Sequence, residues 1–255
     1  MRQKTKFGPM KQFAHFNVED EFAAAISRVG GQRATEVIGR LPGHENADFL
    51  FLSAAVVAEL KCLDEDKIAD ERIIMKASQL YVEELNSGRA PVVAFGTVRM
   101  TTQGFSEEYT RKVFDLYRVP IERQIKKADR QIAATTHAIK MPNSAGLLLV
   151  ANNNHTALDP WHAGYILNEI LAKPEHTNIN SAVLFSGNLA AAMPGESERI
   201  DYWVQINRDS QAPVDQAFLS QVRSAWHSHL EQLFACQAAH QGISDMNTLS
   251  RLESR

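Results

Sequence analysis

The chain has 255 residues, of which 44% are hydrophobic and 22% are charged, as in an ordinary globular protein. This composition excludes a disordered chain, and no apolar run approaches the roughly 18 residues that a membrane-spanning helix needs. Only two cysteines occur, and the basic N-terminus is not followed by the apolar segment of a secretory signal. We therefore expect a cytoplasmic protein with no membrane association, forming a single domain over residues 1–255.

The net charge of −3 is unevenly distributed along the chain. Residues 111–140 contain eight basic and three acidic side chains, a net charge of +5, so the rest of the chain carries −8. A basic stretch in an acidic protein suits a polyanionic partner such as nucleic acid. A solvated helix face with i,i+4 ion pairs would give the same pattern, so charge alone leaves both interpretations open.

The N-terminal third predicts a helix followed by three strands. Residues 18–28 have the pattern of a first helix, and residues 33–38 that of a short strand. Two further strands are expected over residues 48–52 and 55–63, joined by a two-residue turn at Ser53–Ala54.

The middle of the chain predicts a helical insertion. Apolar residues recur at helical spacing from residue 66 to residue 85, a short apolar segment covers 91–98, and a long helix ends near Lys140. We expect residues from about 64 to 110 to form an inserted helical lobe. Residues 146–151 follow as a continuous apolar run, which is typical of a buried strand.

The last third predicts a helix, two strands and a helix. Asp159 as N-cap and Pro160 at the first helical position indicate a helix that ends near Ala172. Strands are expected over residues 181–186 and 200–206. The final helix has one apolar stripe, formed by Phe218, Val222, Trp226, Leu230 and Leu233. The whole order favours an α/β fold with a central mixed β-sheet flanked by helices.

The candidate chemistry lies in the second and third strands. If they pair about Ser53–Ala54, Asp48 lies opposite Glu59 with Cβ atoms about 5 Å apart. Lys61 shares the face of Glu59, because side chains alternate along a strand. Two adjacent carboxylates among apolar residues repel each other unless a cation lies between them, and Mg²⁺ prefers such oxygen ligands. A surface hairpin with a cross-strand ion pair remains the alternative.

The residues Asp48 and Glu59-Leu60-Lys61, with their apolar flanks, resemble the PD-(D/E)XK signature of the restriction-endonuclease-like nucleases. The resemblance covers roughly residues 18–63 and 120–206, although Ala47 replaces the proline of the motif. It implies an αβββαβ core and a metal-dependent phosphodiesterase that acts on nucleic acid, with DNA as the expected substrate, in defence or DNA processing. Family members often act as dimers, so a homodimer or a partner subunit is also implied.

The same resemblance assigns roles to individual residues. Asp48, Glu59 and the backbone carbonyl of Leu60 would bind Mg²⁺ or Mn²⁺, and Lys61 would be the catalytic lysine. Gln131 or Lys127, on the helix after the motif, would face the site. On the basic stretch we expect Lys126, Lys127 and Arg130 to contact nucleic acid.

A glutamate of the first helix often completes such sites, and the sequence does not choose between Glu19 and Glu21. A non-catalytic member of the same fold, acting as a nucleic-acid-binding or assembly subunit, remains the alternative function.

Three other groups are weaker candidates. His155, Asp159 and His162 have the residue types of a zinc site, but they lack the spacing of ligands on one helix face. Residues 152–155 follow a buried strand, where α/β proteins often contact substrates, although a polar loop explains them equally well. His227 and His229 lie in the final amphipathic helix, where we expect a surface and a boundary residue.

Overall fold

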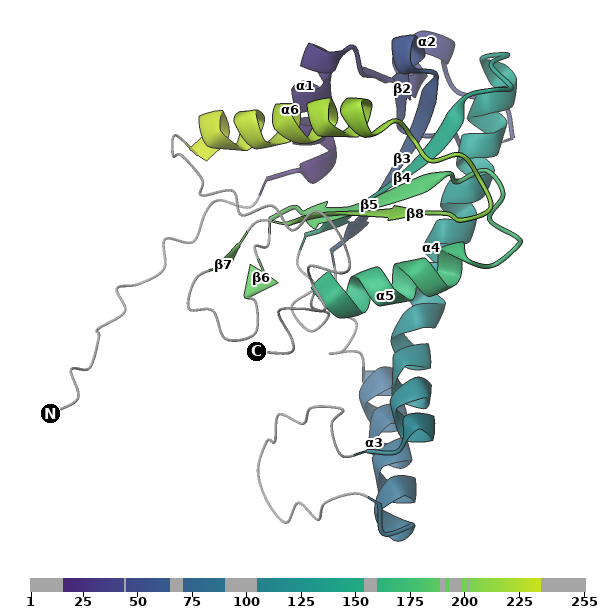
Figure 1. The fold of residues 1–255 in the computed structure, drawn as a ribbon, viewed down its shortest axis with the longest axis vertical. Helices are drawn as coiled ribbons and strands as arrows, with labels where there is room; N and C mark the ends of the chain where they lie inside the picture. Colours follow the sequence, from purple (N-terminus) through teal and green to yellow (C-terminus); the bar gives the residue numbers. More distant parts are fainter. Residues whose placement is uncertain are drawn as a thin grey trace, which may run out of the picture.

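The computed structural model describes residues 16–43, 45–64, 71–89, 105–153, 160–188, 191–192, 199–200 and 202–234. At its centre lies a six-stranded mixed sheet with the strand order β1-β2-β3-β4-β5-β8 (Figure 1). The strands are β1 (Gln32–Arg33), β2 (Phe49–Phe51), β3 (Val56–Leu63), β4 (Ala145–Asn152), β5 (Ser181–Ser186) and β8 (Trp203–Asn207). Strands β3, β4 and β5 are parallel, and every other pairing is antiparallel. The predicted α/β class with a central mixed sheet is therefore confirmed.

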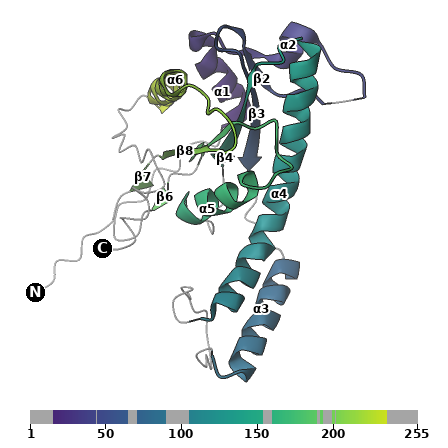
Figure 2. The same cartoon turned by 45° about the vertical axis from the view of Figure 1, so that its right-hand side comes forward.

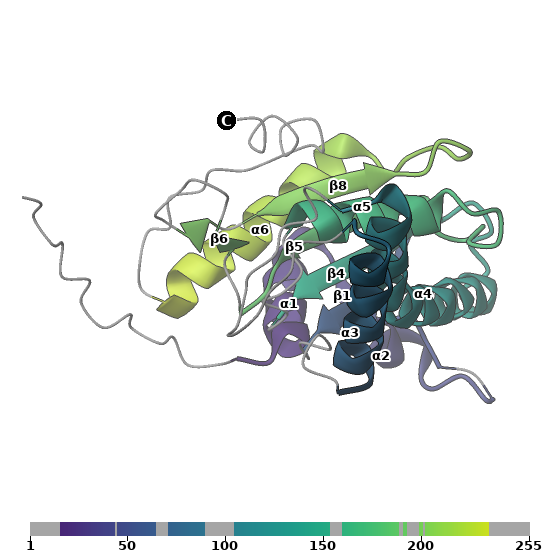
Figure 3. The same ribbon diagram turned by 90° about the horizontal axis from the view of Figure 1, so that it is seen from below.

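Helices cover both faces of this sheet (Figures 1 and 3). The helices α1 (Val18–Ile26) and α6 (Gln216–Phe234) pack on one face. The other face is covered by α5 (Pro160–Leu171) and by the second half of α4 (Glu107–Ala138). Because both faces are covered, the central strands are buried on both sides, which explains their continuous apolar sequences. None of the described helices combines the length and apolar character needed to cross a membrane.

The β2–β3 hairpin has the predicted register. Phe49 pairs with Ala58, so the next position outward places Asp48 opposite Glu59. The predicted two-residue turn is wrong, because residues 52–55 connect the strands as a short 3-10 helix, η2 (Leu52–Ala54), followed by Ala55. Both strands are shortened by one residue at the turn, and the pairing of the remaining residues is unchanged.

The strand predicted over residues 33–38 is also wrong. Only Gln32 and Arg33 form strand β1, and residues 34–38 form the short helix α2 (Ala34–Ile38). The amide of Ala34 donates to the carbonyl of Asp48 at 2.9 Å, after which the chain turns away from the sheet. Val37 is exposed on this short helix.

The strand predicted over residues 200–206 is divided in two. Residues Arg199–Ile200 form β7, which pairs with β6 (Ala191–Ala192) in a separate two-stranded sheet. Pairing with β5 begins only at Trp203. In α6 the predicted apolar stripe packs against the sheet, except that Leu233 at its end is exposed.

Two helices extend away from the sheet between β3 and β4 (Figure 2). The helix α3 (Glu71–Asn86) lies beside the first half of α4, and Pro120 lies inside α4. Glu84 joins the C-terminal end of α3 to the N-terminal end of α4. Its carboxylate accepts hydrogen bonds from the side chain of Arg89 and from the amide of Ser106. The described part of the expected insertion is thus helical, and the segment 91–98 lies outside the described residues.

The start of β4 leaves no space for a side chain at Gly146. A Cβ atom there would lie 1.7 Å from the carbonyl oxygen of Asn178. We expect Gly146→Ala to destabilise the fold by about 3 kcal/mol or more, because this backbone contact must open. Chemical denaturation measures the change, with Asn143→Ala, an exposed residue of the preceding turn, as control. Equal stability of the two variants would contradict the close packing described here.

Candidate functional site

The structure brings Asp48, Glu59 and Lys61 together on the face of the sheet that α4 covers. The carboxylate of Glu59 is 1% exposed and accepts hydrogen bonds from the amide of Asp48 at 3.1 Å and from the ammonium of Lys61. Asp48 lies directly before β2, and its Oδ2 accepts a hydrogen bond from the amide of Leu60 at 2.8 Å. The three charged side chains therefore form one connected cluster across the two strands.

Helix α4 adds Gln131 to this cluster. The side-chain oxygen of Gln131 accepts a hydrogen bond from Lys61 at 3.1 Å, and its amide nitrogen donates to the carbonyl of Asn46 at 2.9 Å. One turn later, the buried hydroxyl of Thr135 accepts a hydrogen bond from the amide of Ala47 at 2.7 Å. These contacts fasten α4 to the segment before β2, so Gln131 is held with its oxygen on Lys61.

Burial raises the pKa of both carboxyl groups, Glu59 and Asp48. Desolvation, followed by the nearby charge of Asp48, raises the pKa of Glu59 from 4.5 to about 8, although Lys61 opposes the shift. Desolvation also raises the pKa of Asp48, with Glu19 adding to the effect. The cluster therefore holds two carboxylates whose ionisation an added cation would favour.

The structure distinguishes the two glutamates of α1. Phe22 fixes the rotation of this helix, because its buried ring packs between Phe49, Phe185 and Trp226. Glu21 then points towards α6, where it contacts His229 at 2.6 Å. Glu19 instead lines a pocket of about 320 Å³ together with Asp48.

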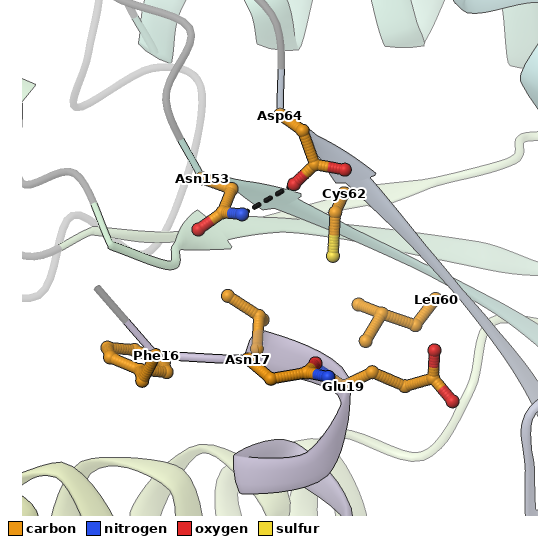
Figure 4. Close-up of a pocket in the computed structure, with 8 residues that line it drawn as sticks. Phe16, Asn17, Glu19, Leu60, Cys62, Asp64 and Asn153 are labelled. Carbon is orange, nitrogen blue, oxygen red and sulfur yellow. Dashed lines mark hydrogen bonds between the residues drawn. The ribbon is translucent and has the colours of Figure 1, made fainter.

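Glu19 also lines a second pocket, of about 510 Å³, together with Leu60 and Cys62 (Figure 4). Its carboxylate is paired with Arg33 at 2.7 Å. Glu19 is therefore the first-helix glutamate that lies beside the candidate site, and a metal would have to compete with Arg33 for it.

The backbone of Leu60 faces the same place. In a β-strand the N–H and C=O groups of one residue point towards the same edge. Since the N–H of Leu60 points towards Asp48, its carbonyl also points towards the edge where β2 has ended. A carbonyl oxygen, two carboxylates and water would give a hard cation an all-oxygen environment.

The basic residues named from the sequence lie on the exposed side of α4. Lys127, Arg130 and Gln131 line a small pocket of about 190 Å³, and Lys126 is exposed beside it. Lys127 forms an ion pair with Glu45 at 2.5 Å, whereas the one side-chain hydrogen bond that Arg130 makes among the described residues is to the carbonyl of Lys126 in its own helix. The basic face of α4 is thus next to the charged cluster.

Of the three residues of the candidate zinc site, the structure describes only one. His155 and Asp159 lie outside the described residues. His162 packs against the rings of Trp161 and Phe114, where α5 meets α4.

Sequence reasoning missed three residues that support or line the site. Thr135 binds the segment before β2, Arg33 pairs with Glu19, and Arg40 lines the pocket of Asp48. The spacing of Thr135 four residues after Gln131 was the only available signal, since residues four apart share a helix face. Both arginines depend on the course of α2, which the sequence did not predict.

Comparison with protein-family models, with curated proteins and with solved structures found no significant match.

The raised pKa of Glu59 predicts a pH dependence of the metal-free protein. Between pH 4.5 and about 8 the folded chain binds more protons at Glu59 than the unfolded chain does. This contribution to stability is therefore present at low pH and is lost as the pH rises through about 8. Asp48→Asn should reduce that loss, because it removes a charge that raises the pKa of Glu59 and keeps an acceptor for Leu60.

Chemical denaturation from pH 6 to 9 in the presence of a chelator measures this dependence. Asp209→Asn, an exposed residue after β8, is the matched control. If both variants lose stability with the wild-type slope, Asp48 does not act on Glu59.

Proposed function

We propose that this chain is a metal-dependent nuclease whose site contains Asp48, Glu59, Lys61 and Gln131. The observation that carries the proposal is the connected cluster in which Lys61 bridges a buried glutamate and a glutamine from a different element. A simple surface ion pair would require neither the burial of Glu59 nor the contact with α4.

The order of elements supports a restriction-endonuclease-like core. A helix, three strands, a long helix and a fourth strand follow in sequence as α1, β1, β2, β3, α4 and β4. The additional helices α2 and α3 lie between these elements. In this arrangement β3 carries Glu59 and Lys61, and β2 is its antiparallel neighbour.

The donor set suits Mg²⁺ or Mn²⁺. Asp48 and Glu59 would hold the ion, with the carbonyl of Leu60 as a third protein ligand and Glu19 as a fourth if Arg33 releases it. Asp48 lines the pocket of about 320 Å³ beside Glu19, so an ion could reach its carboxylate from there. A bound divalent ion polarises a phosphoryl oxygen and lowers the pKa of a coordinated water.

The remaining chemistry would belong to Lys61 and its support. Lys61 is not a ligand for a hard metal, since its ammonium has no lone pair. It would position the attacking water or offset the charge that develops on the phosphate. Gln131 would keep the ammonium in place, because its own amide is fixed by Asn46.

A nucleic acid is the substrate that the surroundings favour. Lys126, Lys127 and Arg130 lie next to Gln131 on the exposed face of α4, where phosphate groups on either side of the cleaved bond would be contacted. DNA is therefore the first substrate to test, with RNA as the alternative.

Lys61→Met separates metal binding from chemistry. We expect it to retain Mg²⁺ or Mn²⁺ binding and to lose about 10²- to 10³-fold in cleavage rate, the usual effect of removing such an electrostatic group. Asp48→Ala should lose metal and activity together. Lys61 lowers the pKa of Glu59, so Lys61→Met should raise that pKa. Calorimetric titration should therefore be done at about pH 9, where protonation of Glu59 competes least with metal binding.

Cleavage is assayed on plasmid, linear duplex, single-stranded DNA and RNA, with Lys112→Met as control. Lys112 lies on α4 in an exposed ion pair with Glu108, far along the helix from Gln131. Wild-type cleavage by Lys61→Met would make this lysine a structural partner of Glu59. Absence of divalent-metal binding in the wild type would favour a non-catalytic nucleic-acid-binding protein.

A second experiment tests the basic face. The double variant Lys126→Ala/Arg130→Ala should weaken DNA binding and lower the salt-dependence slope by about two, one for each lost phosphate contact. Lys127→Ala should have a smaller effect, since Glu45 already neutralises that lysine. Fluorescence anisotropy across salt concentrations measures both, with Lys112→Ala as control. An unchanged slope in the double variant would assign these residues to an ordinary solvated face.

A further inference from the structure

Three potential metal ligands meet where α4 packs against the loop between α5 and β5. Glu122 comes from α4, whereas Glu175 and His176 come from the loop. One ligand atom of each side chain lies within 4.8 Å of the corresponding atoms of the other two. Glu122 is nine residues before Gln131, about 13 Å along the helix, so this cluster is separate from the site of Asp48 and Glu59.

The buried imidazole of His176 lacks hydrogen-bond partners among the described residues. Its side chain is 1% exposed, and within the described part of the chain neither Nδ1 nor Nε2 has a hydrogen-bond partner. Buried polar groups in folded proteins almost always have a partner. Burial also lowers the pKa of His176, so the ring is neutral at neutral pH and keeps a lone pair for a metal.

The loop is held in place independently of any ligand. The guanidinium of Arg208, at the end of β8, donates to the carbonyl of His176 and to that of Lys173. Asp129 of α4 accepts hydrogen bonds from the amide of Asn178 at 2.8 Å and from its side chain at 2.9 Å. The two loop residues, Glu175 and His176, are therefore positioned by contacts that do not use their own side chains.

The carboxylate of Glu122 already has two basic side chains beside it. Glu122 accepts a hydrogen bond from the ammonium of Lys173, and Arg118 lies 3.7 Å from its other oxygen. Lys173, with Arg118, holds the pKa of Glu122 below its usual value, so this ligand is ionised at neutral pH. Lys173 would compete with a metal for Glu122.

We infer that Glu122, Glu175 and His176 form a metal site for Zn²⁺ or a transition ion of similar preference, with water as the fourth ligand. An imidazole with two carboxylates suits Zn²⁺, whereas Mg²⁺ prefers oxygen ligands alone. Such an ion would tie the α5–β5 loop to the middle of α4. This site does not depend on the proposed nuclease function.

Calorimetric titration of the metal-free full-length chain with Zn²⁺ tests the site. All proteins carry Asp48→Asn, so that zinc binding at the other carboxylates is suppressed. We expect one equivalent of Zn²⁺ to bind. Glu175→Gln should weaken it by more than the roughly 10- to 100-fold that loss of a supporting outer contact costs. Glu175 is exposed, so this variant should fold normally, whereas a substitution at the buried His176 would also disturb packing.

Two further variants make the test specific. Glu169→Gln, an exposed glutamate of α5, should bind Zn²⁺ like the parent protein. Lys173→Met should bind it more tightly, because the competing ammonium is removed. The inference is overturned if the parent binds no Zn²⁺, or if Glu175→Gln and Glu169→Gln bind it equally well.

Discussion

The buried carboxylate of Glu59 is the constraint on which the rest of the site depends. A charged group that is 1% exposed is costly unless partners compensate for the lost water. Lys61 and the amide of Asp48 supply part of this compensation, but Asp48 also brings a second negative charge. The remaining imbalance is what a divalent cation would remove. A carboxylate buried in such a place is more readily explained by ligand binding than by stability, because a well-packed apolar residue often stabilises such a position at least as well.

Helix α4 connects the cluster to the rest of the molecule. Gln131 and Thr135 bind the segment before β2, and Asp129 holds the α5–β5 loop on another side of the same helix. Glu122, two helical turns before Asp129, belongs to the proposed zinc site. A metal there would restrict the movement of α4 relative to the loop, and thereby the position of Gln131 against Lys61. The two proposed sites would then be coupled through one rigid helix, without direct contact between their ligands.

The sequence predicted those features that follow from local periodicity. The register that places Asp48 opposite Glu59 was predictable, because strand alternation and apolar flanks determine it even when the turn length is wrong. The helix at residues 34–38 was not, since a hydrogen bond to a distant carbonyl directs the chain there. The choice between Glu19 and Glu21 required the rotation of α1, which aromatic packing from three other elements determines. The sequence thus predicted the catalytic candidates and missed what surrounds them.

The shortness of β2 explains why the edge of β3 beside Asp48 is open. Its pairing with β3 ends at Phe49, and the side chain of Asp48 replaces the next strand residue by accepting the N–H of Leu60. If β2 continued, its backbone would also pair with the carbonyl of Leu60 and would close this edge of β3. Because the pairing stops before Asp48, the backbone carbonyl of Leu60 and the carboxylate of Asp48 lie at the same edge of β3. Glu19 of α1 lies beside them. The arrangement of ligands therefore follows from where one strand ends, in addition to the residue types of the motif.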